Sequence, residues 1–158
     1  MSGHHEIKSA SSGVKLTYDD FLLFPDDGKR HELIDGEHYV TPTPILRHQA
    51  ILGRLHLHIA TYLKREPRGQ VFFAPLDVIL TRFDVVEPDL LYVSRDRSAV
   101  LQDWVRGAPD LIVEVGSPST RTRDETIKRT LYEREGVITA NPSADTERRG
   151  LLRDGLGA

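Results

Sequence analysis

The chain has 158 residues, enough for one ordinary domain, and its 39% hydrophobic and 28% charged residues are typical of a globular protein and not of a disordered or fibrous one. It contains no cysteine, which excludes disulfides, thiolate metal sites and cysteine nucleophiles. The formal net charge of −3 argues against a protein that coats nucleic acid over its whole surface, but it permits a local basic groove.

The two ends of the chain differ from its middle. Residues 1–13 are polar and lack the apolar run of a secretory signal, so we expect a disordered leader. Residues 14–137 are expected to form one domain, and residues 138–158 an atypical, loosely attached tail with little apolar content. No stretch approaches the roughly eighteen apolar residues of a membrane span. We therefore expect no membrane partner, and the absence of cysteine makes the cytoplasm the expected compartment.

The first half of the domain is predicted to contain a short helix, a hairpin and a long helix. Thr17 is a suitable N-cap for the short helix. The extended segment from His31 to Val40 contains Asp35-Gly36, a pair typical of a hairpin turn. The long helix is predicted from Pro44, with Thr43 as its N-cap, to about Arg65, because its apolar residues recur at helical spacing.

The second half is predicted to contain strands and a further helix. The strands are expected in four apolar runs at residues 70–74, 77–80, 85–93 (interrupted at 87–89) and 111–115. A helix is expected over 121–135, with Ser119 or Thr120 as its cap and Gly136 as its stop. This order of elements predicts an α/β fold with a mixed β-sheet flanked by helices.

Two acids lie within the apolar runs. Asp89 follows Val85–Pro88, and Glu114 lies between Val113 and Val115. An ionised carboxylate in such a place is costly unless a positive group pairs with it. Each acid alone is well explained by strand termination or by pairing with an arginine. The two together favour a functional site about as strongly as a structural one, because perturbed acids gather at such sites.

Positive and imidazole side chains lie on the two long helices. Arg121, Arg123 and Arg129 are candidate nucleic-acid contacts, although a solvated helix face explains these arginines better. His48 and His56 are eight residues apart, without the i, i+4 spacing or third ligand that zinc requires, so we do not expect a structural zinc site.

A series of motifs extends from about Leu16 to Val137. The motifs are His31 to Glu37, His48, Glu87 to Leu90, Asp110 to Thr120, Asp124, Lys128, Tyr132 and Gly136-Val137. The segment from Glu114 to Thr120, followed by the spaced Asp, Lys and Tyr, is fairly specific. Together these motifs resemble the Uma-type family of restriction endonucleases, which belongs to the PD-(D/E)XK nuclease superfamily.

The resemblance implies a restriction-endonuclease-like core and a phosphodiesterase site that uses Mg²⁺, or Mn²⁺ in its place, with DNA as the substrate. The family's acids correspond to Glu32, Asp89 and Glu114, which would hold the metal ion, and its lysine corresponds to Lys128. The superfamily usually places this lysine two residues after the acid, where this chain has Gly116. Lys128 would therefore supply the amine from the following helix. A homodimer is an open possibility.

The match weakens after Gly136-Val137. Family members continue into a strand with a Tyr-Trp pair that ends at Asp-Pro, whereas Asn141-Pro142 follows almost directly here. We therefore expect the sheet to lack its C-terminal strand. Besides an endonuclease, two hypotheses remain: a catalytically inactive nuclease-like domain that binds nucleic acid or a partner protein, and a metal-binding module unrelated to nucleic acid.

Overall fold

The computed structural model describes residues 13–41, 43–116 and 123–142, and every structural statement refers to this part of the chain. The expected leader, apart from Gly13, lies outside it, as do the candidate helix caps Ser119 and Thr120. Residues 143–158 of the expected tail also lie outside it.

One mixed sheet has five strands in the order β2-β1-β5-β4-β7. Its strands are β1 (Arg30–Ile34), β2 (Glu37–Thr41), β4 (Val78–Thr81), β5 (Asp84–Val86) and β7 (Val105–Arg106). Only β4 and β7 run parallel to each other. The hairpin between β1 and β2 turns at Asp35 and Gly36, whose φ angles of 51° and 77° are typical of a two-residue type I′ turn. The predicted hairpin is thus confirmed.

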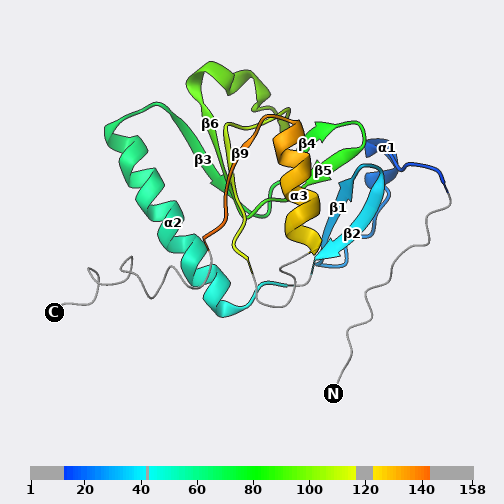
Figure 1. The fold of residues 1–158 in the computed structure, drawn as a ribbon. Coiled ribbons are helices and arrows are strands. Elements are labelled where there is room, and N and C mark those ends of the chain that lie inside the picture. The colour runs from blue at the N-terminus through cyan, green and yellow to red at the C-terminus, as the bar shows by residue number, and fades with distance from the viewer. Residues whose placement is uncertain (1–12, 42, 117–122, 143–158) are drawn as a thin grey trace.

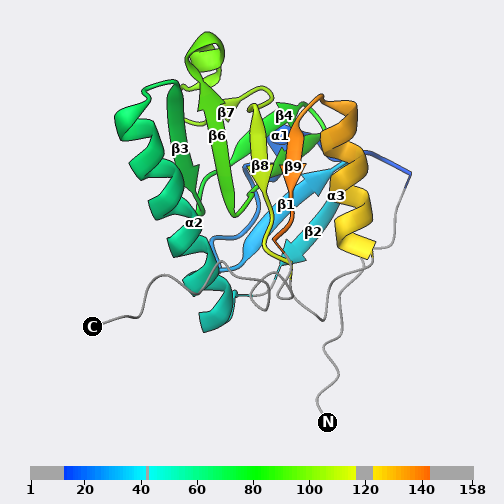
Figure 2. The same cartoon turned by 60° about the vertical axis from the view of Figure 1, so that its left-hand side comes forward.

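A second sheet has four strands in the order β3-β6-β8-β9 (Figure 2). Its strands are β3 (Gly69–Phe73), β6 (Leu90–Ser94), β8 (Leu111–Val113) and β9 (Ile138–Ala140). The sequence predicts a single sheet, and the structure has two because the apolar run 85–93 is divided. Pro88 cannot donate a hydrogen bond to a sheet, and the segments on its two sides, β5 and β6, join different sheets.

The helices pack around the strands, and the two long helices, α2 and α3, lie on opposite sides of the second sheet (Figure 1). They are α1 (Tyr18–Phe21), α2 (Leu46–Arg65) and α3 (Arg123–Arg134), and a 3₁₀ helix, η1, spans Arg95–Val100. Thr17 is the N-cap of α1, as predicted. The predicted start of α2 is wrong by two residues, because the backbone stays extended through Ile45 and Thr43 is too far from the first turn to cap it. None of these helices is both long and apolar enough to cross a membrane.

The end of α3 is built as the sequence predicts. Gly136 has a φ of 70°, a conformation that suits glycine after a helix. The N–H of Val137 donates to the carbonyl of Tyr132 at 2.9 Å, and that of Gly136 donates to Glu133 at 3.2 Å. These two bonds form a Schellman motif, which turns the chain back toward the second sheet.

The expected loss of the C-terminal strand is wrong for residues 138–140. They form β9, which pairs in parallel with β8 and aligns Ile138 with Leu111. Ile138 is 68% exposed, so its side chain contributes little burial. Backbone hydrogen bonds hold this short strand at the sheet edge, and an edge strand held in this way does not need the apolar residues whose absence suggested a tail.

The main core joins both sheets and α3. It includes Val78 and Val86 from the first sheet, Leu91 and Ile112 from the second, and Tyr132 from α3. A separate cluster joins α2 to the other face of the second sheet. These contacts bring the end of β8, the start of β6 and one face of α3 into the same region, where the acidic residues lie.

Candidate functional site

Asp89 and Glu114 lie next to each other at one end of the second sheet. Asp89 directly precedes β6 and Glu114 directly follows β8, and these antiparallel strands align Leu90 with Val113. The predicted strand 111–115 therefore ends earlier than expected, at Val113. The backbone N–H of Val115 donates to Asp89 Oδ2 at 2.7 Å, which ties the two acidic segments together.

Strand β9 fixes the backbone around Glu114. The N–H of Glu114 donates to the carbonyl of Ala140 at 3.1 Å, and the N–H of Gly116 donates to Asn141 Oδ1 at 3.2 Å. The segment that the sequence suggested was lost is therefore present in a short form, and it helps to position a predicted site residue.

Asp89 is held by two further side chains. Arg30 Nη1 donates to its Oδ1 at 2.7 Å, and His48 Nε2 lies 2.9 Å from its Oδ2. An ionised carboxylate can only accept hydrogen bonds, so Nε2 of His48 must carry the proton. The Nδ1 atom of His48 is buried, and no described residue forms a hydrogen bond with it.

Glu32 enters the same region from β1 and is only 1% exposed. Its Oε1 accepts the backbone N–H of Glu87 at 2.9 Å and lies 2.8 Å from Lys128 Nζ. Its Oε2 lies 3.4 Å from the hydroxyl of Thr41. The buried charge of Glu32 is therefore compensated mainly by one lysine and one backbone N–H.

Helix α3 presents Lys128 and Tyr132 on one face, because they are four residues apart. Lys128 Nζ lies 3.1 Å from Glu114 Oε1, and the Tyr132 hydroxyl donates to the same oxygen at 2.6 Å. Lys128 therefore bridges Glu32, in the first sheet, and Glu114, which directly follows a strand of the second sheet.

The pKa values of this cluster reflect burial among charges of both signs. Burial raises the pKa of Glu114, and the negative charges of Glu32 and Asp89 add to this effect against the attraction of Lys128. Burial alone would lower the pKa of Lys128, but Glu114 and Glu32 together outweigh it and raise the pKa. Lys128 is accordingly a cation in the folded protein. Burial also raises the pKa of Tyr132, and the charge of Glu114 adds to this.

The cluster carries an excess of negative charge. Among the described residues, hydrogen bonds and ion pairs connect four carboxylates, of Glu32, Glu87, Asp89 and Glu114, to two permanent cations, Arg30 and Lys128. With all six ionised, the formal charge of this set is −2. Burial and the negative charge of Glu32 raise the pKa of Asp77, a further carboxyl that is affected by the charge of this cluster.

The donor set fits a hard divalent cation in chemistry and charge, because carboxylate oxygens are the ligands that Mg²⁺ and Mn²⁺ prefer. These oxygens do not form a preformed metal site, however. Among the described residues, no group of three or more His, Asp or Glu side chains is arranged to hold a metal ion. Arg30 and Lys128 lie against carboxylates that such an ion would need.

The structure thus brings together Glu32, Asp89, Glu114 and Lys128, the four predicted site residues. The three arginines predicted as nucleic-acid contacts are not part of the cluster as described. Arg121 lies outside the described residues, Arg123 is described only as part of the α3 backbone, and Arg129 is exposed and pairs with Glu133 at 2.9 Å.

Sequence reasoning missed Arg30 and assigned no role to Tyr132. Arg30 and Glu32 are two apart on one strand and so share a face, a signal that was available from the alternation. Tyr132 follows Lys128 by one helical turn. The sequence pointed to His48 as a family motif and as a zinc candidate, but not to its contact with Asp89. His56 packs edge-on against Phe73, with ring centroids 4.6 Å apart.

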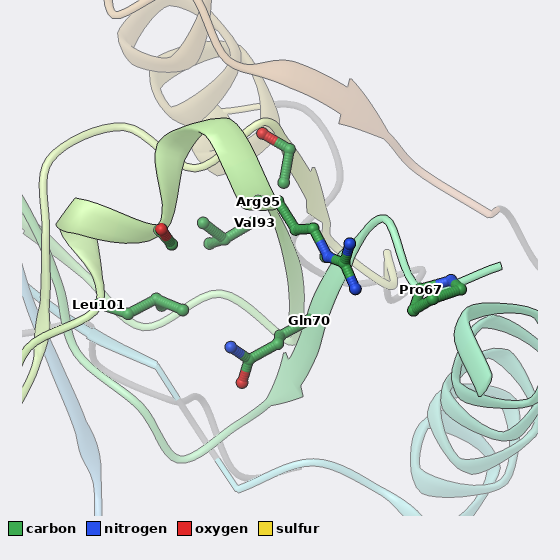
Figure 3. Close-up of a pocket in the computed structure, with 8 residues that line it drawn as sticks. Pro67, Gln70, Val93, Arg95 and Leu101 are labelled. Carbon is green, nitrogen blue, oxygen red and sulfur yellow. The ribbon is translucent and has the colours of Figure 1, made fainter.

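A hollow of about 310 Å³ lies at the opposite end of β3 and β6 (Figure 3). Gln70, Val93, Arg95 and Leu101 are among the residues that line it, and none of the acids of the cluster does so. Gly69 and Ser94 pair at this end, whereas Phe73 and Leu90 pair at the end next to Asp89. The hollow is therefore separate from the acidic cluster.

Comparison with known proteins agrees with this architecture. The model of the Uma2 family, described as "Putative restriction endonuclease", matches residues 18–139. A solved structure, "a putative nuclease belonging to DUF820 from Anabaena variabilis ATCC 29413", has a TM-score of 0.67 and 22% identity, covering 82% of this chain and 75% of that one. No curated protein matches. The structural likeness shows a shared α/β nuclease-like fold, and the family match supports a nuclease function. This chain belongs to the Uma2 family, within the restriction-endonuclease-like proteins.

Proposed function

We propose that this protein is a divalent-metal-dependent DNA endonuclease that hydrolyses phosphodiester bonds. One observation carries the proposal: Glu32, Asp89, Glu114 and Lys128, from four separate segments, converge in one hydrogen-bonded cluster that has excess negative charge and in which Glu32 and Asp89 are buried. Placing several carboxylates together is costly, and chains retain such clusters mainly at functional sites.

Asp89, Glu114 and Glu32 would hold Mg²⁺ or Mn²⁺. When bound, such an ion supplies an activated water and offsets the charge that develops on the phosphate oxygens. Lys128 adds a fixed positive charge between Glu32 and Glu114, where it orients both carboxylates and attracts the phosphate. The Tyr132 hydroxyl donates to Glu114 Oε1, the oxygen that Lys128 also contacts, and so helps to hold this carboxylate in place.

Arg121, Arg123 and Arg129 on and before α3 are proposed to contact the DNA backbone next to this cluster. Phosphate contacts of this kind release counterions, so binding should weaken steeply as salt rises. Charge reversal of Arg129, which is exposed, should weaken DNA binding without affecting the fold. Affinity that is independent of salt and of this substitution would exclude α3 as the DNA contact.

The proposal is tested by incubating supercoiled and single-stranded DNA with the protein in Mg²⁺, Mn²⁺ or EDTA. Asp89→Asn should abolish cleavage and reduce the rise in melting temperature that millimolar Mn²⁺ causes. Asp110→Asn is the matched control, because Asp110 also accepts a backbone N–H, that of Ser94 at 2.7 Å, but at the other end of the second sheet. Equal cleavage by the Asp89→Asn and Asp110→Asn variants would overturn the proposed site.

A catalytically inactive domain that binds nucleic acid or a partner protein is the second candidate. It is favoured by the contacts of Arg30 and Lys128 with carboxylates that a metal ion would need, and by the lack of a preformed metal site among the described residues. DNA binding that persists in EDTA, with no cleavage under any metal condition and no effect of Asp89→Asn, would support this candidate over the enzyme.

A further inference from the structure

Asp89 has little capacity left for a metal ion. A carboxylate oxygen accepts about two hydrogen bonds. Oδ2 of Asp89 already has two donors, His48 Nε2 at 2.9 Å and the N–H of Val115 at 2.7 Å. Among the described residues, Oδ1 has one donor, Arg30 Nη1 at 2.7 Å. The lone pair that remains for a cation is therefore on the same oxygen that the guanidinium group of Arg30 binds.

Arg30 also has a second partner. Its Nε lies 3.0 Å from Glu87 Oε1, and the side chains of Arg30 and Glu87 are about equally buried, with 15% and 14% exposed. Arg30 is thus shared between Asp89 and a carboxylate two residues earlier. If Arg30 left Asp89, Glu87 would still neutralise it within the protein.

We propose that Arg30 is the resident counter-cation of Asp89 and that it competes with the divalent cation for this carboxylate. Arg30 stabilises the metal-free protein and lowers its affinity for metal, and Glu87 keeps Arg30 in place when a metal ion binds. This inference rests on the proposed function, because it requires the metal ion to bind at Asp89. It also explains why the carboxylates are not arranged as a preformed cage.

A simpler role for Arg30 makes the opposite prediction. If Arg30 only orients Asp89 as a metal ligand, its removal should weaken metal binding, because the carboxylate would lose a hydrogen bond that fixes its direction. If Arg30 competes with the metal ion, its removal should strengthen binding. The sign of the change in affinity therefore separates a positioning residue from a competing one.

The experiment measures Mn²⁺ binding to the full chain by isothermal titration calorimetry, without DNA. Arg30→Gln should bind Mn²⁺ at least about tenfold more tightly than wild type, and Arg30→Lys, which keeps the charge, should stay within about threefold. Melting curves without metal show whether each variant is folded. Binding by Arg30→Gln that is equal to or weaker than wild type would overturn the inference.

A double variant with the same net charge as wild type removes two ambiguities. Arg30→Gln alone changes the net charge of the cluster and leaves Glu87 unpaired, so it could bind metal by general attraction or fail to fold. The double variant Arg30→Gln/Glu87→Gln keeps the net charge and removes the unpaired acid. It should still bind Mn²⁺ several times more tightly than wild type. Unchanged or weaker binding in this variant would refute competition by Arg30, whatever the single variant does.

Asp89→Asn in the same titrations distinguishes the two proposals. If Asp89→Asn binds Mn²⁺ as wild type does, the metal lies elsewhere, and the proposed site and this inference both fail. If Asp89→Asn loses binding but the double variant gains none, only the competition fails and the proposed function remains. If Asp89→Asn loses Mn²⁺ binding and the double variant binds Mn²⁺ more tightly than wild type, both the proposed function and the competition by Arg30 are supported.

Discussion

Replacing Lys128 with methionine should destabilise the fold strongly. The methionine keeps most of the volume of the aliphatic stem but removes the amine that lies 2.8 Å from Glu32 and 3.1 Å from Glu114. Removing one partner of a buried ion pair costs about 3–5 kcal/mol, because a charge is left without compensation. The lower end of this range applies here. Glu114 is 22% exposed and already has a raised pKa, so it can take up a proton and limit the loss to about 3 kcal/mol.

Urea denaturation followed by circular dichroism measures this loss as a change in the free energy of unfolding. Arg129→Met is the matched control on the same helix, because the pair between Arg129 and Glu133 is 75% and 62% exposed and should contribute less than about 1 kcal/mol. Adding Glu32→Gln to Lys128→Met should restore part of the stability, since it removes the buried charge that the lysine had compensated.

A loss for Lys128→Met no larger than that for Arg129→Met would refute this reasoning, because it would mean that Lys128 is not paired inside the protein. The same result would weaken the proposed catalytic role of Lys128, which depends on its position between two carboxylates. If instead Lys128→Met is destabilised but Glu32→Gln gives no recovery, Glu114 alone would be the partner of the lysine.

Three further outcomes are expected. Burial and the neighbouring charge of His31 lower the pKa of His38 from its ordinary 6.5. The contribution of His38 to the free energy of unfolding should therefore be fully present above about pH 6.5 and decrease as the pH drops below it. His38→Gln should weaken this pH dependence of the melting temperature. Ile138→Pro should lower the melting temperature more than Ile138→Ala, because only proline removes the 3.1 Å hydrogen bond from this N–H to the chain before β8. Asp84→Asn should lower the free energy of unfolding in urea by about 1.5–3 kcal/mol, because the carboxylate is 3% exposed and accepts a charged hydrogen bond from Arg134. A decrease of less than about 0.5 kcal/mol would contradict that hydrogen bond.

The sequence alone predicted those features of the fold that depend on a few neighbouring residues. Asp35-Gly36 predicted the hairpin turn, Thr17 the start of α1, and Gly136 the end of α3, because each depends on the backbone preferences of a few adjacent residues. The apolar runs located most strands for the same reason. The apolar runs drew attention to Asp89 and Glu114, and the resemblance to a nuclease family predicted that Glu32 and Lys128 belong to the same site.

Only the tertiary structure decided how these residues meet and what holds them. The apolar run 85–93 looks continuous, but its two halves belong to different sheets, since the partners of each half come from distant parts of the chain. Strand β9 has exposed side chains and exists because β8 offers a free edge, which sequence composition cannot reveal. The pairing of Asp89 with Arg30 joins residues 59 positions apart. Such ion pairs depend on where the folded chain excludes water, and that is a property of packing rather than of any segment of sequence.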